Sequence, residues 1–275
     1  MKMLENSTIV RQSTITMGKF QPLGVSNLLF QIDGTKNIFG GLADAGVPLN
    51  SGFAHSSINR YMLTSNLIQY HVDSETPVVL DFGCGAGSFK SFWDRNFQLN
   101  GKKSLDYIGL EVTPSYIDEG TANGHVIRHF DANNQDIRDI ELPCSVDVIL
   151  MQQFVEHIDE RALDYLLEYA YELLTKGGML VVSSPDALVD ELVVEHHHDK
   201  EYTFDEMVTK LESKGFKLKQ RFGWLGHGKP FFSELTDIEK EIYNKLRYIS
   251  NGYANSVMCM INERFAPYYY LVLSK

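Results

Sequence analysis

The chain has 275 residues, enough for one large domain or one domain with an extension. Its 25 basic and 36 acidic residues give a net charge of −11, which argues against broad nucleic-acid binding because such binding needs a basic surface. No stretch approaches the roughly 18 apolar residues of a membrane span, and the first residues lack the apolar core of a signal peptide. The three cysteines are widely spaced without a C-x-x-C pair, so we expect a protein of a reducing compartment, the cytoplasm.

Short apolar segments alternate with helical stretches from Val78 onward. This alternation predicts an α/β fold with a mostly parallel sheet and helices on both faces. A clear helix is predicted over 159–175, beginning at Asp159 and ending at Gly177-Gly178, because its apolar residues fall at helical spacing. Seven strands are expected, over 78–83, 106–112, 125–131, 146–152, 179–184, 217–223 and 267–274.

Two segments lie outside this alternation. Residues 1–74 form an N-terminal extension with a possible helix at Ser56–His71. The main domain is expected over 75–275, with a helical insertion at about 227–266. The helix of the insertion should start after Thr236, which has the pattern of an N-terminal cap.

A glycine-rich turn follows the first predicted strand. The stretch contains Asp81, Gly83, Gly85 and Gly87 in the spacing D-x-G-x-G-x-G. A dinucleotide fingerprint reads G-x-G-x-x-G, and a phosphate loop ends in G-K-[ST], so neither pattern fits. Glycines at alternate positions let the backbone bend tightly and let a ligand approach the main chain.

This spacing resembles the first motif of the class I S-adenosylmethionine-dependent methyltransferases. The resemblance implies a Rossmann-like seven-stranded sheet whose last strand is antiparallel, and S-adenosyl-L-methionine as cofactor. It further implies that the turn, including Cys84, passes under the amino acid and ribose of the cofactor. Asp81 would help to hold the methionine ammonium. In this fold, extensions such as 1–74 and 227–266 commonly cover the substrate pocket.

Further cofactor contacts are expected after the second, third and fourth strands. Glu111, followed by Val112, can accept hydrogen bonds from both ribose hydroxyls. The resemblance assigns the adenine to Asp131 and Ala132, although Asp131 can instead cap a turn. Gln152 and Gln153 end the fourth strand, where the loop faces the methyl group in this family.

Glu156-His157 is the predicted catalytic pair. Many small-molecule and RNA O-methyltransferases carry a Glu-His pair at this place, and a histidine can remove a proton from a hydroxyl or amine near neutral pH. The alternative is that the pair merely opens the next helix and His157 packs against the loop.

A histidine run, His196-His197-His198, suggests a metal site. Metal-dependent small-RNA 2′-O-methyltransferases place E-x-x-E-H after the fourth strand and a further histidine later. Here Gln153 replaces the first glutamate while Glu156, His157 and His198 stand at matching places. Because one charged ligand is missing, we expect no bound metal.

The sequence therefore predicts methyl transfer from S-adenosyl-L-methionine to an oxygen or nitrogen of a small-molecule or sugar acceptor. Two alternatives stay open: a metal-assisted RNA 2′-O-methyltransferase, and a non-catalytic cofactor-binding partner protein. Nucleic acid and membrane are not expected partners. The basic cluster is interpreted as a solvated surface rather than an RNA contact; it consists of Lys210, Lys214, Lys217, Lys219 and Arg221.

Overall fold

The computed structural model describes residues 52–96, 104–187, 198–224, 235–248, 254–255, 257–259, 262 and 266–275, with only the backbone of 52–59. The chain divides into two compact units. One comprises 71–221 with 268–275, and the other comprises 1–70 with 222–267. Among the described residues, no helix combines the length and apolar character that a bilayer span requires.

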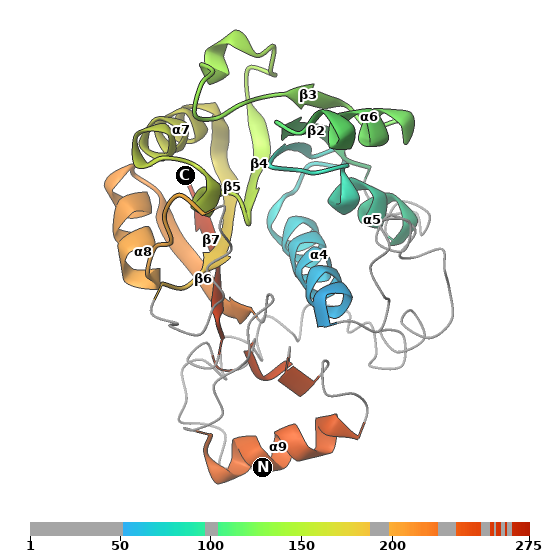
Figure 1. Ribbon diagram of the computed structural model, residues 1–275, viewed down its shortest axis with the longest axis vertical. Helices are drawn as coiled ribbons and strands as arrows, with labels where there is room; N and C mark the ends of the chain where they lie inside the picture. Colours follow the sequence, from blue (N-terminus) through green and yellow to red (C-terminus); the bar gives the residue numbers. More distant parts are fainter. Residues whose placement is uncertain are drawn as a thin grey trace. The chain divides into compact units, whose positions relative to one another are not determined.

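A seven-stranded sheet, in the order β3-β2-β1-β4-β5-β7-β6, organises the first unit (Figure 1). Its central strands are parallel, and β7 inserts antiparallel beside β5, between β5 and β6. The predicted fold class is thus confirmed, including the antiparallel last strand. The strands are β1 (Val78–Phe82), β2 (Asp106–Glu111), β3 (Ile127–His129), β4 (Val146–Gln152), β5 (Leu174–Pro185), β6 (Lys217–Trp224) and β7 (Tyr268–Ser274).

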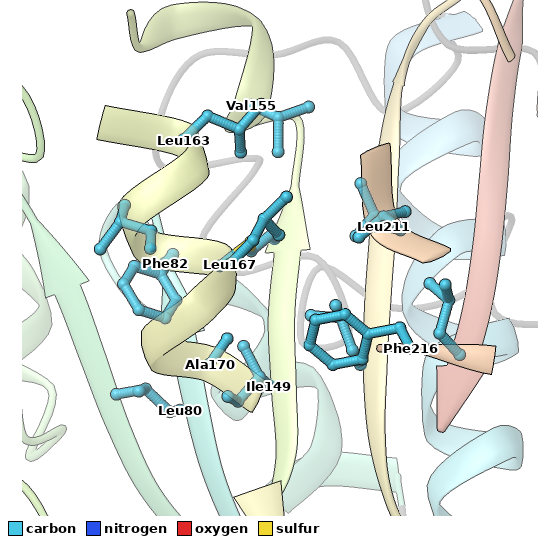
Figure 2. Packing of buried hydrophobic residues seen from close by; sticks show 14 of the residues in the cluster. Leu80, Phe82, Ile149, Val155, Leu163, Leu167, Ala170, Leu211 and Phe216 are labelled. Carbon is cyan, nitrogen blue, oxygen red and sulfur yellow. The ribbon is translucent and has the colours of Figure 1, made fainter. Parts of the chain in front are cut away.

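The main core lies between one face of this sheet and helices α7 and α8. Figure 2 shows α7 directing Leu163, Leu167 and Ala170 toward strand residues such as Leu80 and Phe82. These side chains are almost completely buried. Burying a leucine or phenylalanine contributes roughly 1.5–3 kcal/mol, so the apolar spacing of the helix and the strand alternation together fix this face.

Successive side chains of a strand point to opposite faces of the sheet, so the neighbours of these core residues on the same strands point to the other face. Val79, Leu150 and Val181 are fully buried there, so this face is covered as well. Asp81 shares the parity of Val79, and it is therefore held on the face away from the α7 core. This placement puts a carboxylate at the end of an otherwise apolar strand.

Helices α7 and α8 begin where their capping residues indicate. The side chain of Asp159 accepts a 2.7 Å hydrogen bond from the Ala162 N–H at the start of α7. Thr203 forms a capping box with Glu206 at the start of α8. The helices of this unit are α5 (Ser88–Asn96), α6 (Pro114–Ala122), η2 (Ile137–Asp139), η3 (Val155–His157), α7 (Glu160–Leu173) and α8 (Phe204–Ser213).

The predicted end of the helix at Gly177-Gly178 is wrong. Gly177-Gly178 do not end a helix, because α7 already stops at Leu173 and β5 starts at Leu174. Gly177 has a φ of 82°, and the pairing of β5 with β4 shifts register across this stretch. The glycines therefore serve an irregularity inside a long strand. The strand predicted over 125–131 is also shorter than expected.

The second unit is described mainly by two helices, α4 (Gly52–His71, of which residues up to Tyr70 belong here) and α9 (Asp237–Arg247). Both were predicted. Thr236 forms a capping box with Glu239 at the start of α9, as expected. Arg60 of α4 lies 5.0 Å from the ring centroid of Trp224, in a cation–π contact.

Gly120 lets α6 pack closely against β3 and the glycine turn. A Cβ added there would lie 2.1 Å from Ile127 Cδ1 and 2.9 Å from the carbonyl oxygen of Ala86 in the glycine turn. We expect Gly120→Ala to destabilise the protein by about 1 kcal/mol or more, because overpacking outweighs the better helix propensity of alanine. Urea unfolding measures this, with the exposed Thr121→Ala as control. A Gly120→Ala protein at least as stable as the parent would contradict the packing described.

Candidate active site

The turn after β1 exposes its main chain at one point. Gly83, Gly85 and Gly87 have φ values of 66°, 56° and 75°, a region that residues with a Cβ avoid. A Cβ at Gly83 would lie 2.9 Å from the Phe154 ring, whereas a Cβ at Gly85 would meet nothing within 4 Å. The backbone at Gly85 is therefore open to a ligand, as the D-x-G-x-G-x-G spacing predicts.

Glu111 joins the end of β2 to this turn. Its Oε2 accepts a 2.9 Å hydrogen bond from the Gly85 N–H. Its Oε1 accepts from the N–H groups of Val112 (3.0 Å) and Thr113 (2.9 Å). At least three of the about four acceptor sites of the carboxylate are thus occupied. A ribose diol can meet Glu111 at both hydroxyls only if one of these amides is released.

Asp81 lies at the end of β1 and is 6% exposed. Its Oδ2 accepts a 2.7 Å hydrogen bond from the Tyr107 hydroxyl on β2. The strand order places Asp81 beside the residues that lead to Glu111, since Asp81 pairs with Gly109. Two carboxylates consequently flank the glycine turn at the carboxyl ends of adjacent strands.

Cys84 turns its side chain into the protein. Its Sγ donates a hydrogen bond to the Gly85 carbonyl at 3.2 Å, and it lies 2.4 Å from where a Cβ on Gly109 would stand. Burial, followed by the nearby Asp81 and Glu111 charges, raises the pKa of the Cys84 thiol. Because the side chain is buried against Gly109, the backbone of Cys84 is the part that suits the predicted cofactor contact.

Asp131 forms a turn after β3. Its Oδ1 accepts from the Asn133 N–H at 3.1 Å and its Oδ2 from the Asn134 side-chain amide at 2.8 Å. This is the capping alternative that the sequence left open. Ala132 packs against the main core. An adenine contact of Asp131 is not visible in this arrangement and remains a prediction.

Gln152 and Gln153 end β4 in different ways. Gln152 is buried, with its Nε2 3.4 Å from the Tyr270 hydroxyl. Gln153 has a φ of 57°, the only positive value of a non-glycine residue in the described chain. Its Nε2 is buried and has no hydrogen-bond partner. Strained backbone and unsatisfied polar groups of this kind cluster at functional sites.

Glu156 and His157 lie in η3, immediately beyond β4. Glu156 is 1% exposed, whereas His157 is exposed. The Glu156 carbonyl accepts a 2.8 Å hydrogen bond from the Asp199 N–H, which brings the segment after β5 back to η3. The ligand atoms of Glu156, His157 and His198 all lie within 4.8 Å of one another. His196 and His197 lie outside the described residues.

His198 has a fixed orientation. Its Nδ1 lies 2.7 Å from Glu201 Oε1, and its ring centroid is 4.8 Å from that of His157. A carboxylate on one imidazole nitrogen turns the other nitrogen toward a ligand, as in many metal sites. The sequence had matched His198 to such a site by position, and the structure brings it to the Glu-His pair.

Three polar residues of the strands that contact or neighbour the site residues were not singled out from the sequence as site residues. Tyr107 contacts Asp81. Ser183 and Tyr270 stand in register with Gln152 across β4, β5 and β7, and both are fully buried. Their hydroxyls interrupt otherwise apolar strands, which was the available signal. The sequence alone does not reveal which residues are their neighbours across the sheet.

Comparison with known proteins supports this description. A family model described as a methyltransferase domain matches residues 80–180, which run from β1 into β5. No curated protein matches the chain by sequence.

Solved structures share the fold at low sequence identity. A SAM-dependent methyltransferase from Archaeoglobus fulgidus is 19% identical, with 81% of this chain and 93% of that chain covered and a TM-score of 0.51. The cyclase SpnF is 17% identical, with 87% of this chain and 93% of SpnF covered and a TM-score of 0.53. Magnesium protoporphyrin IX methyltransferase from Synechocystis was solved with bound SAH. It is 11% identical, with 82% of this chain and 85% of that chain covered and a TM-score of 0.51.

Proposed function

We propose that this chain, whose residues 80–180 match a methyltransferase-domain model, is a class I S-adenosylmethionine-dependent methyltransferase that methylates an oxygen or nitrogen of a small-molecule or sugar acceptor. The observation that carries this proposal is the pairing of Glu111 with the open glycine turn at Gly85, followed beyond β4 by an exposed histidine beside a buried glutamate. The first feature suits the cofactor, and the second suits an acceptor that loses a proton.

The cofactor lies over the turn in this proposal. Asp81 attracts the methionine ammonium, Glu111 accepts from the ribose, and Asp131 with Ala132 borders the adenine. The backbone of Gly83, Cys84, Gly85 and Gly87 approaches the amino acid and ribose. Val112, which is 48% exposed next to Glu111, offers an apolar surface to the base. Gln152 and Gln153 border the methyl group.

The transfer is a direct displacement. A lone pair of the acceptor atom forms the new bond to the methyl carbon while the carbon–sulfur bond breaks. The electron pair of the broken bond stays on sulfur, so the sulfonium becomes a neutral thioether. The acceptor proton passes to His157. The Glu156 carboxylate stabilises the resulting imidazolium. Positioning of the reactants in line lowers the activation free energy by roughly 7–11 kcal/mol. A general base raises the rate by a further factor of roughly 10²–10⁴.

Charge supports a small acceptor over RNA. In the basic cluster, Lys210 lies 2.9 Å from Asp164 and Lys214 lies 2.7 Å from Glu168. These lysines are paired with carboxylates of α7, so they contribute little to a phosphate-binding surface. The remaining members, Lys217, Lys219 and Arg221, are exposed. The cluster is thus partly ion-paired and partly solvated, which supports a surface role over an RNA groove.

Acceptor identity is proposed to depend on the extensions at 1–74 and 227–266. Among the residues of these segments that the structure describes, none forms a strand in the β3-β2-β1-β4-β5 part of the sheet, and we propose both segments as covers of the substrate pocket. All three cysteines are free, in keeping with a cytoplasmic location.

The Glu156–His157–His198 cluster favours a second candidate, metal-assisted methylation, with an RNA 2′-hydroxyl as its acceptor. One carboxylate and two imidazoles suit a divalent ion. Ligands of one ion stand roughly 3–4 Å apart, so the 4.8 Å limit of this cluster needs only a small closure. A bound ion would supply a Lewis acid that polarises the acceptor hydroxyl.

We expect His157→Ala to keep cofactor binding and to lower methyl transfer by roughly 10²–10⁴-fold, because the proton acceptor is lost. Labelled S-adenosylmethionine incubated with the metabolite, RNA and protein fractions of a cell extract measures transfer. The exposed His129→Ala is the control. Label should enter the metabolite fraction.

Other outcomes of the transfer assay count against this proposal. Label in RNA would favour the second candidate. Cofactor binding without transfer to any fraction would favour a non-catalytic binding protein. Undiminished transfer by His157→Ala would remove His157 from the mechanism.

The second candidate predicts calorimetric binding of Mn²⁺ that His198→Ala abolishes and that Glu201→Gln weakens by about 10–100-fold. His129→Ala should leave the titration unchanged. If the parent protein binds no Mn²⁺ and transfers methyl groups equally well after treatment with a chelator, metal assistance is excluded.

A further inference from the structure

We propose that Tyr107 is a positioning residue for the cofactor: its hydroxyl orients the Asp81 carboxylate toward the ammonium of the methionine moiety. This inference rests on the proposed assignment of Asp81 to that ammonium. Tyr107 was not among the residues that the sequence pattern indicated, because it lies near the start of β2, whereas the predicted site residues follow the carboxyl ends of the strands.

The contact is short and sealed from solvent. The Tyr107 hydroxyl donates to Asp81 Oδ2 at 2.7 Å, and the two residues are 4% and 6% exposed. They come from adjacent parallel strands, with Tyr107 opposite Val79 and Asp81 opposite Gly109. A buried hydrogen bond to a charged group is worth about 1.5–3 kcal/mol, which is enough to select one orientation of a short side chain.

The hydroxyl is a permanent donor. Burial, followed by the Asp81 charge, raises the pKa of Tyr107 well above its ordinary value. Tyr107 therefore stays protonated through the physiological range. With Oδ2 held in this way, the direction of Oδ1 is fixed too, since both oxygens belong to one planar carboxylate.

A neutral donor also leaves the charge of Asp81 in place. A lysine or arginine at position 107 would neutralise the carboxylate, and a cationic ligand would then gain little from it. Tyrosine orients the carboxylate without cancelling its charge. This combination suits recognition of an ammonium group.

The tyrosine ring is held independently of its hydroxyl. Its centroid lies 6.5 Å from that of His125 in an edge contact, and His125 Nε2 lies 2.7 Å from Ser91 Oγ on α5. The His125 ring also packs against Gly87, where a Cβ would come within 2.7 Å of it. Tyr107→Phe keeps this packing and removes only the donor, so it is a suitable test.

The test compares two ligands by calorimetry. S-adenosylhomocysteine carries the amino acid moiety, whereas 5′-methylthioadenosine ends at the thioether and lacks the ammonium. We expect Tyr107→Phe to weaken the first by about tenfold and to leave the second within twofold. Tyr116→Phe, an exposed tyrosine of α6, is the matched control. Equal weakening of both ligands, or of neither, overturns the proposal.

A double-mutant cycle with Asp81→Asn separates positioning from general damage. If Tyr107 acts through the carboxylate, Tyr107→Phe should have little further effect on S-adenosylhomocysteine affinity in the Asp81→Asn background. Additive losses mean that Tyr107 acts otherwise, and overturn the proposal. Failure of the parent protein to bind S-adenosylhomocysteine would instead reject the proposed function, so the two failures are distinguishable.

Discussion

The hydrogen bond from the Gly85 N–H to Glu111 Oε2 is the contact on which the candidate site depends. It ties the turn after β1 to the end of β2, two segments that are distant in sequence and adjacent only because the sheet is parallel. The same carboxylate holds the backbone of Val112 and Thr113. Glu111 thus sets the shape of both sides of the proposed cofactor site.

The charges of Asp81 and Glu111 indicate which kind of ligand this arrangement would favour. Asp81 and Glu111 are nearly buried, and the contacts described for them are neutral donors, a tyrosine hydroxyl and backbone amides. Neutral donors stabilise the carboxylates without neutralising them. Such carboxylates would favour a ligand that carries a sulfonium and an ammonium group, as the proposed cofactor does.

The sheet and the strand-end carboxylates could be predicted from local sequence. Val78–Phe82 is an apolar strand that runs into Gly83, and Asp159 precedes a helix of regular apolar spacing, so periodicity and capping sufficed. Gly177-Gly178 misled because a glycine pair ends helices and also permits strand irregularities. The outcome depended on pairing with β4, which no local pattern encodes.

The same limit applies within the site. Glu111 and Asp81 stand at strand ends, where function is expected, but their partners Gly85 and Tyr107 are chosen by strand order and register. The sequence left two roles open for Asp131, because an aspartate after a strand can bind a ligand or cap a turn. The proximity of His198 to His157 depends on the backbone hydrogen bond from Asp199, in the segment after β5, to Glu156 in η3. Sequence supplied the residue types, and the tertiary structure supplied their contacts.

The most direct measurement of this account is calorimetric titration of the protein with S-adenosylmethionine, S-adenosylhomocysteine and NAD, alongside Glu111→Ala and the exposed Glu119→Ala. The account predicts that the parent and Glu119→Ala bind the first two ligands and not NAD, and that Glu111→Ala stays folded but loses this binding. Undiminished binding by Glu111→Ala, or binding of NAD in preference to S-adenosylmethionine, would contradict it.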